Sequence, residues 1–341
     1  MKKILAIRFS AMGDVAMTVP VIASVARQYP ELEITVLTRP FLQPLFSTLP
    51  SNVKFKGINL KDKRYKGIRG IYRMYQELAS EQYDCIADLH DVLRTQLLRT
   101  FFYLHGKEVY FIHKGRRERK AILGHPDHLL PTSFERYADV FKRAGFPASI
   151  VFNSIFEGKV PNYIPIEAFT GKKNDDSWVG IAPFAAHKGK IYPLDKMEHI
   201  IATLSQRANT HLFLFGAGSY ENGILSDWEK KYPNTTNVGT RSGGLQNELL
   251  LMSRLNVMVS MDSANMHLAS LTGTPVVSIW GATHPNAGFM GWHQKKTDAV
   301  HTDLPCRPCS IFGNKPCRRK DYACLYNLSE TTILQRILAY L

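Results

Sequence analysis

The stretch at residues 3–38, KILAIRFSAMGDVAMTVPVIASVARQYPELEITVLT, decides the fold class. An apolar run over residues 3–9 is followed by a helical pattern over 14–28 and a second apolar run over 33–38. A strand, a helix and a strand in this order are typical of two parallel strands joined by a crossover helix. The stretch therefore predicts an α/β fold, with helices on both faces of a parallel sheet.

The same alternation continues through the first half of the chain. The further predicted strands are residues 54–58, 83–89 and 108–112, and the further helices are residues 68–80, 93–104 and 134–144. Together these elements predict a first α/β domain over residues 1–160.

A stretch without a clear period at residues 158–177, GKVPNYIPIEAFTGKKNDDS, then interrupts the pattern with prolines, glycines and charges. It predicts a linker, with bounds at residues 161–177. The alternation restarts with strands at residues 178–182, 211–215, 256–261 and 275–280, and with helices at 194–207, 220–231, 245–255 and from 264. This predicts a second α/β domain over residues 178–328. Residues 329–341 carry apolar side chains on one helical face and predict a last helix, which could pack back on the N-terminal domain.

Length and charge agree with two domains and limit the partners. The 341 residues exceed what one ordinary core holds, and 45% hydrophobic residues exclude a wholly disordered chain. The net charge is +14, and residues 1–150, with 24 Lys and Arg against 14 Asp and Glu, carry +10 of it. This balance suits a nucleic acid, an anionic membrane surface or a phosphorylated small molecule.

The N-terminus begins with two lysines and an apolar run, as a signal peptide does, but Arg8 and Asp14 interrupt that run. No stretch reaches the roughly 18 uncharged apolar residues that a membrane-spanning helix needs. We therefore expect a mature, cytoplasmic start.

Four motifs follow predicted strands, where α/β sheets bind ligands. The first, SAMGD at residues 10–14, is a small turn that leads into a helix. Its Asp14 is either a favourable first-turn residue or a general base.

The second motif, AAHKGKIYP at residues 185–193, offers Lys190 to a phosphate, although a solvated loop is the simpler interpretation. The third, FGAGSYE at residues 215–221, ends in Glu221, which could accept hydrogen bonds from a ribose. In the fourth, SMDSANMH at residues 260–267, Asp262 and Ser263 could cap a helix whose N-terminus faces a phosphate, with His267 on its first turn.

In their order and position, these motifs resemble glycosyltransferase family 9, the heptosyltransferases of lipopolysaccharide core assembly. The segments that carry the resemblance are ILAIRFSAMGDVAMTVPV, ADLHDVLRTQLLR, KGKIYP, FGAGSYE and VSMDSANMHLASLTGTPVVSIWGATHP. The resemblance covers nearly the whole chain. It implies a GT-B architecture of two Rossmann-like domains, an N-terminal one that binds the acceptor and a C-terminal one that binds the nucleotide sugar.

The resemblance also implies roles for single residues. Asp14 corresponds to the general base, Lys190 to the phosphate-binding lysine and Glu221 to the ribose-binding acid. The donor-binding loop corresponds to Asp262, Ser263, Ala264 and His267. The chain departs from the common pattern with alanine at position 264 and with Ala185 and Ala186 before the lysine, which affects the identity of the nucleotide and the sugar.

The implied reaction is an inverting transfer of heptose from ADP-heptose to an anionic lipopolysaccharide core or lipid A acceptor, without a required cofactor or catalytic metal. Basic clusters at residues 61–73 and 114–120 would hold that acceptor at the cytoplasmic face of the inner membrane, as a peripheral membrane contact. The candidate acceptor-binding residues are Lys63, Arg64, Arg94, Arg116 and Arg119.

Four cysteines, Cys306, Cys309, Cys317 and Cys324, lie within one short basic segment. Four thiols with one C-x-x-C spacing are compatible with a structural zinc ion, although a second C-x-x-C is missing. Two alternatives to the main interpretation remain open at this point. One is a GT-B transferase that uses another sugar nucleotide for a surface polysaccharide, and the other, more distant, is a nucleic-acid-binding protein.

Overall fold

The computed structural model describes residues 2–159 and 161–341, so Met1 and Val160, the predicted ends of the first domain, lie outside the described residues. The contacts divide the chain into two compact units. The first comprises Met1–Lys114 and Thr132–Ile155, and the second comprises Gly115–Pro131 and Phe156–Leu341. The segment Gly115–Pro131 therefore groups with the second unit, although it lies within the predicted first domain.

The first unit contains a parallel sheet whose strand order is β3-β2-β1-β4-β5. The strands are β1 (Lys2–Ile7), β2 (Leu32–Thr38), β3 (Val53–Gly57), β4 (Cys85–Asp88) and β5 (Glu108–Phe111). The chain adds β2 and β3 on one side of β1 and then returns to add β4 on the other side. The loops after β1 and β4 therefore lie at a topological switch point, where ligands bind in such sheets.

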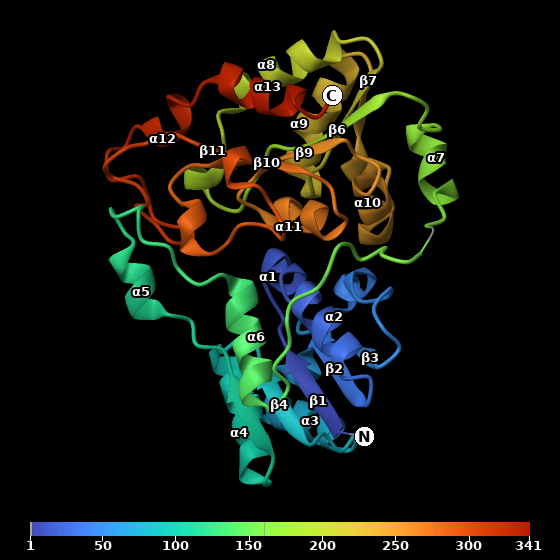
Figure 1. Cartoon of the computed structure of the whole chain (residues 1–341), viewed down its shortest axis with the longest axis vertical. Helices are drawn as coiled ribbons and strands as arrows, with labels where there is room; N and C mark the ends of the chain where they lie inside the picture. Colours follow the sequence, from blue (N-terminus) through green and yellow to red (C-terminus); the bar gives the residue numbers. More distant parts are fainter. Residues whose placement is uncertain (1, 160) are drawn as a thin grey trace. The chain divides into compact units, whose positions relative to one another are not determined.

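Helices cover both faces of this sheet (Figure 1). They are α1 (Met12–Ala16), α2 (Val19–Gln28), α3 (Gly67–Ala79), α4 (Leu93–Leu104) and α6 (Ser133–Arg143). The single helix predicted at residues 14–28 is split into α1 and α2, because Pro20 lacks the amide hydrogen that a continuing helix needs and instead occupies the first turn of α2.

The second unit contains a parallel sheet with the order β11-β10-β9-β6-β7-β8. Its strands are β6 (Ser177–Ala182), β7 (Thr210–Leu214), β8 (Thr235–Asn237), β9 (Val257–Met261), β10 (Val276–Trp280) and β11 (Ala299–His301). The order reverses between β6 and β9, so the loops after these two strands form a second switch point.

The helices of the second unit also lie on both faces of its sheet (Figure 1). They include α8 (Leu194–Ser205), α9 (Gly218–Lys231), α10 (Leu245–Met252), α11 (Ala264–Leu271) and α13 (Glu330–Leu338). Ile333 and Ile337 of α13 are fully buried in the core of this unit. These contacts tie the last helix to the core of the second unit, and its packing on the N-terminal domain stays a prediction.

Several short elements were not predicted, namely α5 (Arg116–Ala121), α7 (Ile164–Thr170), α12 (Ala323–Tyr326) and the strands β8 and β11. Helix α7 occupies the predicted linker, where the buried side chain of Ile166 anchors it. The predicted fold class, two α/β domains with parallel sheets, is confirmed. In residues 2–159 and 161–341, no helix is both long enough and apolar enough to cross a membrane.

Candidate active site

The first unit places polar groups at its switch point. Arg8 follows β1 and is buried, and its guanidinium donates to the carbonyl of Leu89, which follows β4. Ser10 Oγ lies 3.4 Å from the Nε2 of His90 and joins the same two loops a second time. The two loops are therefore tied together at the point where a ligand is expected.

Asp14 lies in the first turn of α1, beside these loops. Its Oδ2 forms an ion pair with Arg8 Nη2 at 2.9 Å and accepts a hydrogen bond from the Ala11 amide at 3.1 Å. The Tyr137 hydroxyl, from α6, donates to the Asp14 carbonyl at 3.3 Å. The carboxylate retains 31% exposure, so it is held in place and yet open to a substrate. A carboxylate fixed in this way can accept a proton.

Two other side chains set the charge of this site. Burial opposes the charge of Arg8, but nearby Tyr137 and Asp14 outweigh it and raise the arginine's pKa. Burial, together with the charges of Arg8 and Lys114, lowers the pKa of His90 to about 4. His90 is therefore neutral at pH 7 and lines the site as a polar, uncharged group.

The switch point of the second unit carries an ion pair. Lys190 Nζ, in the short helix after β6, lies 3.0 Å from Oδ2 of Asp262, which follows β9. Both side chains are largely buried, at 15% and 7% exposure, and Thr283 Oγ1 also donates to Asp262 Oδ2 at 2.8 Å. The predicted donor residues Lys190 and Asp262 thus lie together, and the lysine nitrogen has a fixed position from which it can meet an anion.

Helix α11 begins directly after this pair, with Ser263 at its N-cap position, Ala264 as its first residue and His267 buried in its first turn. The predicted capping by Asp262 and Ser263 side chains is wrong. Asp262 is engaged with Lys190, and the Ser263 hydroxyl lies 3.2 Å from that of Ser260 rather than capping the helix. The N-terminal amides of α11 are therefore not satisfied by the Ser263 side chain and suit an anion.

Glu221 lies in the first turn of α9, and its Oε2 accepts a hydrogen bond from the Ala217 amide at 2.8 Å. This contact fixes the carboxylate at the start of the helix and gives it a structural role. The ribose-binding role implied by the resemblance stays a prediction.

One residue that the motifs did not indicate supports the donor loop. Arg307 is only 2% exposed, and its guanidinium donates to the carbonyls of Gly281 at 2.6 Å, Thr283 at 2.9 Å and Trp280 at 3.2 Å. These contacts fix the backbone that presents the Thr283 hydroxyl to Asp262. Neither a periodic pattern nor a motif in the sequence marks Arg307 as a functional residue. Only its long-range contacts in the structure show its supporting role.

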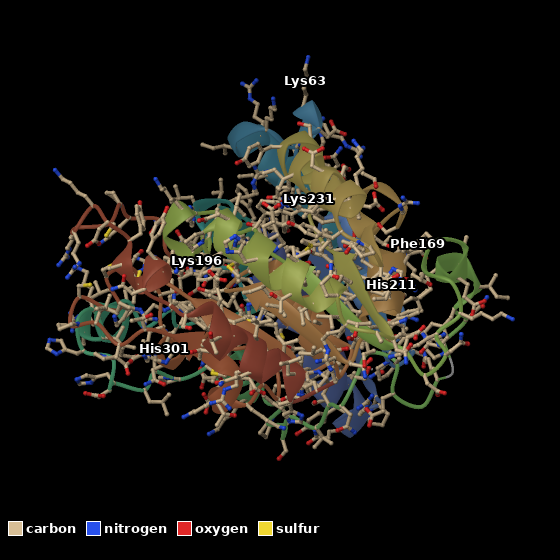
Figure 2. The ribbon with its side chains drawn as sticks, turned by 90° about the horizontal axis from the view of Figure 1, so that it is seen from above. Lys63, Phe169, Lys196, His211, Lys231 and His301 are labelled. Carbon is tan, nitrogen blue, oxygen red and sulfur yellow. The ribbon has the colours of Figure 1, made fainter. Side chains whose placement is uncertain are left out.

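The five predicted acceptor residues fall into two groups. Three of them belong to the first unit, and two of these contact Tyr65. Lys63 is exposed (Figure 2), the Arg64 guanidinium lies over the Tyr65 ring at 4.7 Å, and Arg94 Nη1 donates to the Tyr65 carbonyl at 3.3 Å.

The other two acceptor candidates lie on α5, in the second unit. Arg116 is exposed, and Arg119 lies over the rings of Phe289 and Phe312 at 5.0 and 5.5 Å. The sequence placed both basic clusters in the N-terminal domain, but the contacts group residues 115–120 with the second unit.

The four clustered cysteines were compatible with a structural zinc ion, which the structure does not support. All five cysteines are free, and among the described residues no group of three or more His, Cys, Asp or Glu side chains is arranged to hold a metal ion. Burial raises the pKa of Cys324 to about 11 and that of Cys309 as well, so these two thiols are protonated at pH 7 when no metal is bound.

We expect the thiols to react accordingly. With Ellman's reagent at pH 8, the half-buried Cys306 and Cys317 should react first and Cys309 more slowly, whereas the buried Cys85 and Cys324 should react only after unfolding. Stopped-flow absorbance with mass mapping of the labelled thiols measures this order. Protection of all four clustered cysteines, with release of zinc when they are modified, would contradict it.

Two Rossmann-like units, each with polar groups at its switch point, define a protein of the GT-B class, as predicted. The model of glycosyltransferase family 9 (heptosyltransferase) matches residues 71–322, and the chain belongs to this family. It is therefore a glycosyltransferase.

The relatives to which this chain is similar include heptosyltransferases. Lipopolysaccharide heptosyltransferase 3 of Escherichia coli is 23% identical over 282 residues, covering 80% of this chain and 81% of that protein. The structure of the E. coli ADP-heptose LPS heptosyltransferase II has a TM-score of 0.71 at 17% identity and covers 100% of this chain and 98% of its own. That of the E. coli heptosyltransferase WaaC with ADP has a TM-score of 0.69 at 14% identity and covers 99% and 100%. These relatives favour neither of the two alternatives.

Proposed function

We propose that this protein transfers heptose from ADP-heptose to an anionic lipopolysaccharide core or lipid A acceptor, with inversion at the anomeric carbon. The observation that carries the proposal is the Lys190–Asp262 pair at the switch point of the second unit, directly before the N-terminus of α11. Family membership supports heptose as the sugar, and the ADP complex of a structural relative supports ADP as the nucleotide.

In this proposal, the donor's diphosphate meets Lys190 and the first amides of α11. A lysine ammonium and a helix N-terminus both stabilise negative charge that develops on a leaving group. Ser263, Ala264 and His267 complete the donor loop, and Glu221 accepts hydrogen bonds from the ribose.

Asp14 is the general base of the proposed reaction. It accepts the proton of an acceptor hydroxyl while that oxygen bonds to the anomeric carbon and the nucleoside diphosphate leaves from the opposite face. Arg8 holds the carboxylate in one orientation through the 2.9 Å ion pair. The lysine and the helix amides supply the charge that a divalent metal supplies in other transferases, so we propose that transfer is metal-independent.

The acceptor is proposed to bind through basic side chains. Arg64 and Arg94, which contact Tyr65, and the exposed Lys63 suit phosphate or carboxylate groups of a glycolipid. Arg116 and Arg119 on α5 form a second basic group. Near an anionic membrane each such cation contributes about 1 kcal/mol, which supports peripheral contact at the cytoplasmic face of the inner membrane.

A donor screen tests the proposal. ADP-heptose at about 100 times its dissociation constant should stabilise the fold by about 2.7 kcal/mol and raise the Tm by about 5–10 °C, while GDP- and UDP-sugars should shift it by less than about 2 °C. Differential scanning calorimetry measures the shift, and EDTA should leave it unchanged. Equal stabilisation by a UDP-sugar, or transfer that stops with EDTA, would contradict the proposal.

A further inference from the structure

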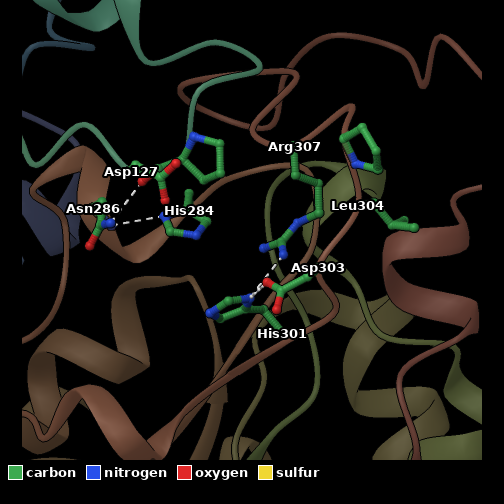
Figure 3. A pocket seen from close by; sticks show the side chains of 9 residues that line it. Asp127, His284, Asn286, His301, Asp303, Leu304 and Arg307 are labelled. Atoms are coloured by element: carbon green, nitrogen blue, oxygen red, sulfur yellow. Dashed lines mark hydrogen bonds and ion pairs between the residues drawn. The ribbon is translucent and has the colours of Figure 1, made fainter.

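The second unit contains a pocket that the proposed function does not use. Its volume is ≈ 530 Å³, within the range of about 300–1,000 Å³ that is common for small-molecule sites. The lining residues come from the segment Gly115–Pro131, from the loop after β10, and from the end of β11 and the loop that follows it (Figure 3). They are Pro126, Asp127, His284, Asn286, His301, Asp303, Leu304, Pro305 and Arg307.

The wall formed by the segment Gly115–Pro131 is held by hydrogen bonds. Asn286 Nδ2 donates to the Pro126 carbonyl at 2.8 Å, and the Leu130 amide donates to the Asn286 carbonyl at 2.9 Å. The same segment carries helix α5, with the basic acceptor candidates Arg116 and Arg119. The pocket is thus a built part of the second unit, and one of its walls belongs to the segment that also carries residues we assign to acceptor binding.

Two imidazoles, His284 and His301, line the pocket with polar ring nitrogens. His284 Nδ1 accepts a hydrogen bond from the Asn286 amide at 3.2 Å. His301 Nδ1 lies between two groups, 3.0 Å from Arg307 Nη1, which can only donate, and 3.4 Å from Asp303 Oδ1, which can only accept. The neutral His284 ring therefore carries its proton on Nε2, and no partner for that Nε2 is present among the described residues.

The imidazoles do not contribute positive charge. Burial and the nearby charge of Arg307 lower the pKa of His284 to about 4 and lower that of His301 as well. Both rings are neutral at pH 7. Arg307 itself is buried, and each of its guanidinium nitrogens already donates to a protein acceptor, including the carbonyls of Gly281 and Thr283.

The accessible charge in the pocket is negative. Asp127 is exposed and the Asp303 side chain is 97% exposed, so two carboxylates accept hydrogen bonds beside the two imidazoles. Pro126, Leu304 and Pro305 add apolar surface. Hydrogen-bond donors and acceptors beside an apolar wall match the hydroxyl groups and the C–H faces of a sugar ring. The two carboxylates disfavour a ligand that carries a phosphate.

We propose that this pocket binds an uncharged sugar unit of the acceptor glycan. The glycan's identity rests on the proposed function, whereas sugar binding itself does not. The pocket adjoins the donor loop, since Thr283 donates to Asp262 and the next residue, His284, lines the pocket. A neutral sugar held here would orient the acceptor while basic side chains hold its anionic groups.

The test uses an Asp127→Ala, Asp303→Ala double variant of the full chain. Saturation-transfer difference NMR with methyl α-D-mannopyranoside should give a signal with the wild-type protein and lose at least about three quarters of it with the double variant. Glucose 6-phosphate should bind at least about tenfold more weakly than the neutral sugar. In a transfer assay, the KM for the acceptor should rise about tenfold, with the KM for the donor unchanged.

The matched control is Asp175→Ala, Asp227→Ala, which removes two exposed carboxylates of the same unit outside the pocket and should behave as the wild-type protein. Calorimetric ADP binding confirms that each variant is folded. Unchanged sugar binding in the pocket variant, equal binding of the phosphorylated sugar, or a rise in the donor KM in place of the acceptor KM overturns the inference. If the wild-type protein transfers no heptose, the proposed function fails, but the NMR comparison still decides the pocket.

Discussion

An Asp14→Asn variant should lose about 10²–10⁴-fold in kcat while it binds ADP as tightly as the wild-type protein, because a general base contributes about that factor. Asparagine has the shape of aspartate, and its amide oxygen can still accept the hydrogen bond from the Ala11 amide, but it cannot take up a proton. The variant therefore separates basicity from the capping contact at 3.1 Å, which the sequence offered as the alternative role of Asp14. Single-turnover transfer kinetics and ADP calorimetry provide the two measurements.

The ion pair with Arg8 needs its own control, because any loss of activity could come from an unpaired buried arginine. Asp139→Asn removes a carboxylate that pairs with Arg143 at 2.8 Å in the same unit, away from the switch point, and should keep wild-type turnover. A turnover of Asp14→Asn within about threefold of the wild-type value would exclude Asp14 as the base and leave it a structural residue.

The fold class was predictable because buried strands and amphipathic helices leave strong periodic signals. The βαβ pattern at residues 3–38 appears in the structure as β1, α1, α2 and β2. The missed strands, β8 and β11, have three residues each, too few to show a period.

The location of the candidate site was predictable for a related reason. Motifs that follow strands gather at one edge of a parallel sheet, and the structure joins Lys190 to Asp262 across 72 residues of sequence at such an edge. The supporting contacts were not predictable, because Arg8, Arg307 and the segment Gly115–Pro131 act through partners that only the fold brings near.

A Lys190→Met variant should bind ADP about 10–100-fold more weakly, since a hydrogen bond to a charged group is worth about 1.5–3 kcal/mol. Methionine keeps the unbranched chain and removes the ammonium group. Because the lysine contacts the phosphates in our proposal, the affinity for adenosine should stay within about twofold of the wild-type value. Isothermal titration with the two ligands isolates the phosphate contact from any general damage to the site.

The same substitution leaves the Asp262 carboxylate, which is 7% exposed, without its cation and with Thr283 as a remaining hydrogen-bond donor. Loss of one partner of a buried pair costs about 3–5 kcal/mol, so Lys190→Met should unfold at a lower temperature. Adding Asp262→Asn removes the stranded charge and should recover much of that stability, but it should not restore ADP affinity. Binding is therefore measured well below the Tm of each variant.

Lys188→Met is the matched control, because this exposed lysine lies two residues earlier in the same short helix, with its Nζ 5.2 Å from the centre of the Tyr322 ring. It should bind ADP within about twofold of the wild-type protein. If Lys190 serves only to neutralise Asp262, Lys190→Met will lose stability but keep its full ADP affinity when folded. If the affinities for ADP and for adenosine fall equally, the substitution has changed the shape of the site, and the proposed contact of Lys190 with the phosphates is wrong. A selective loss for ADP, confined to Lys190, is the outcome that the switch-point geometry predicts.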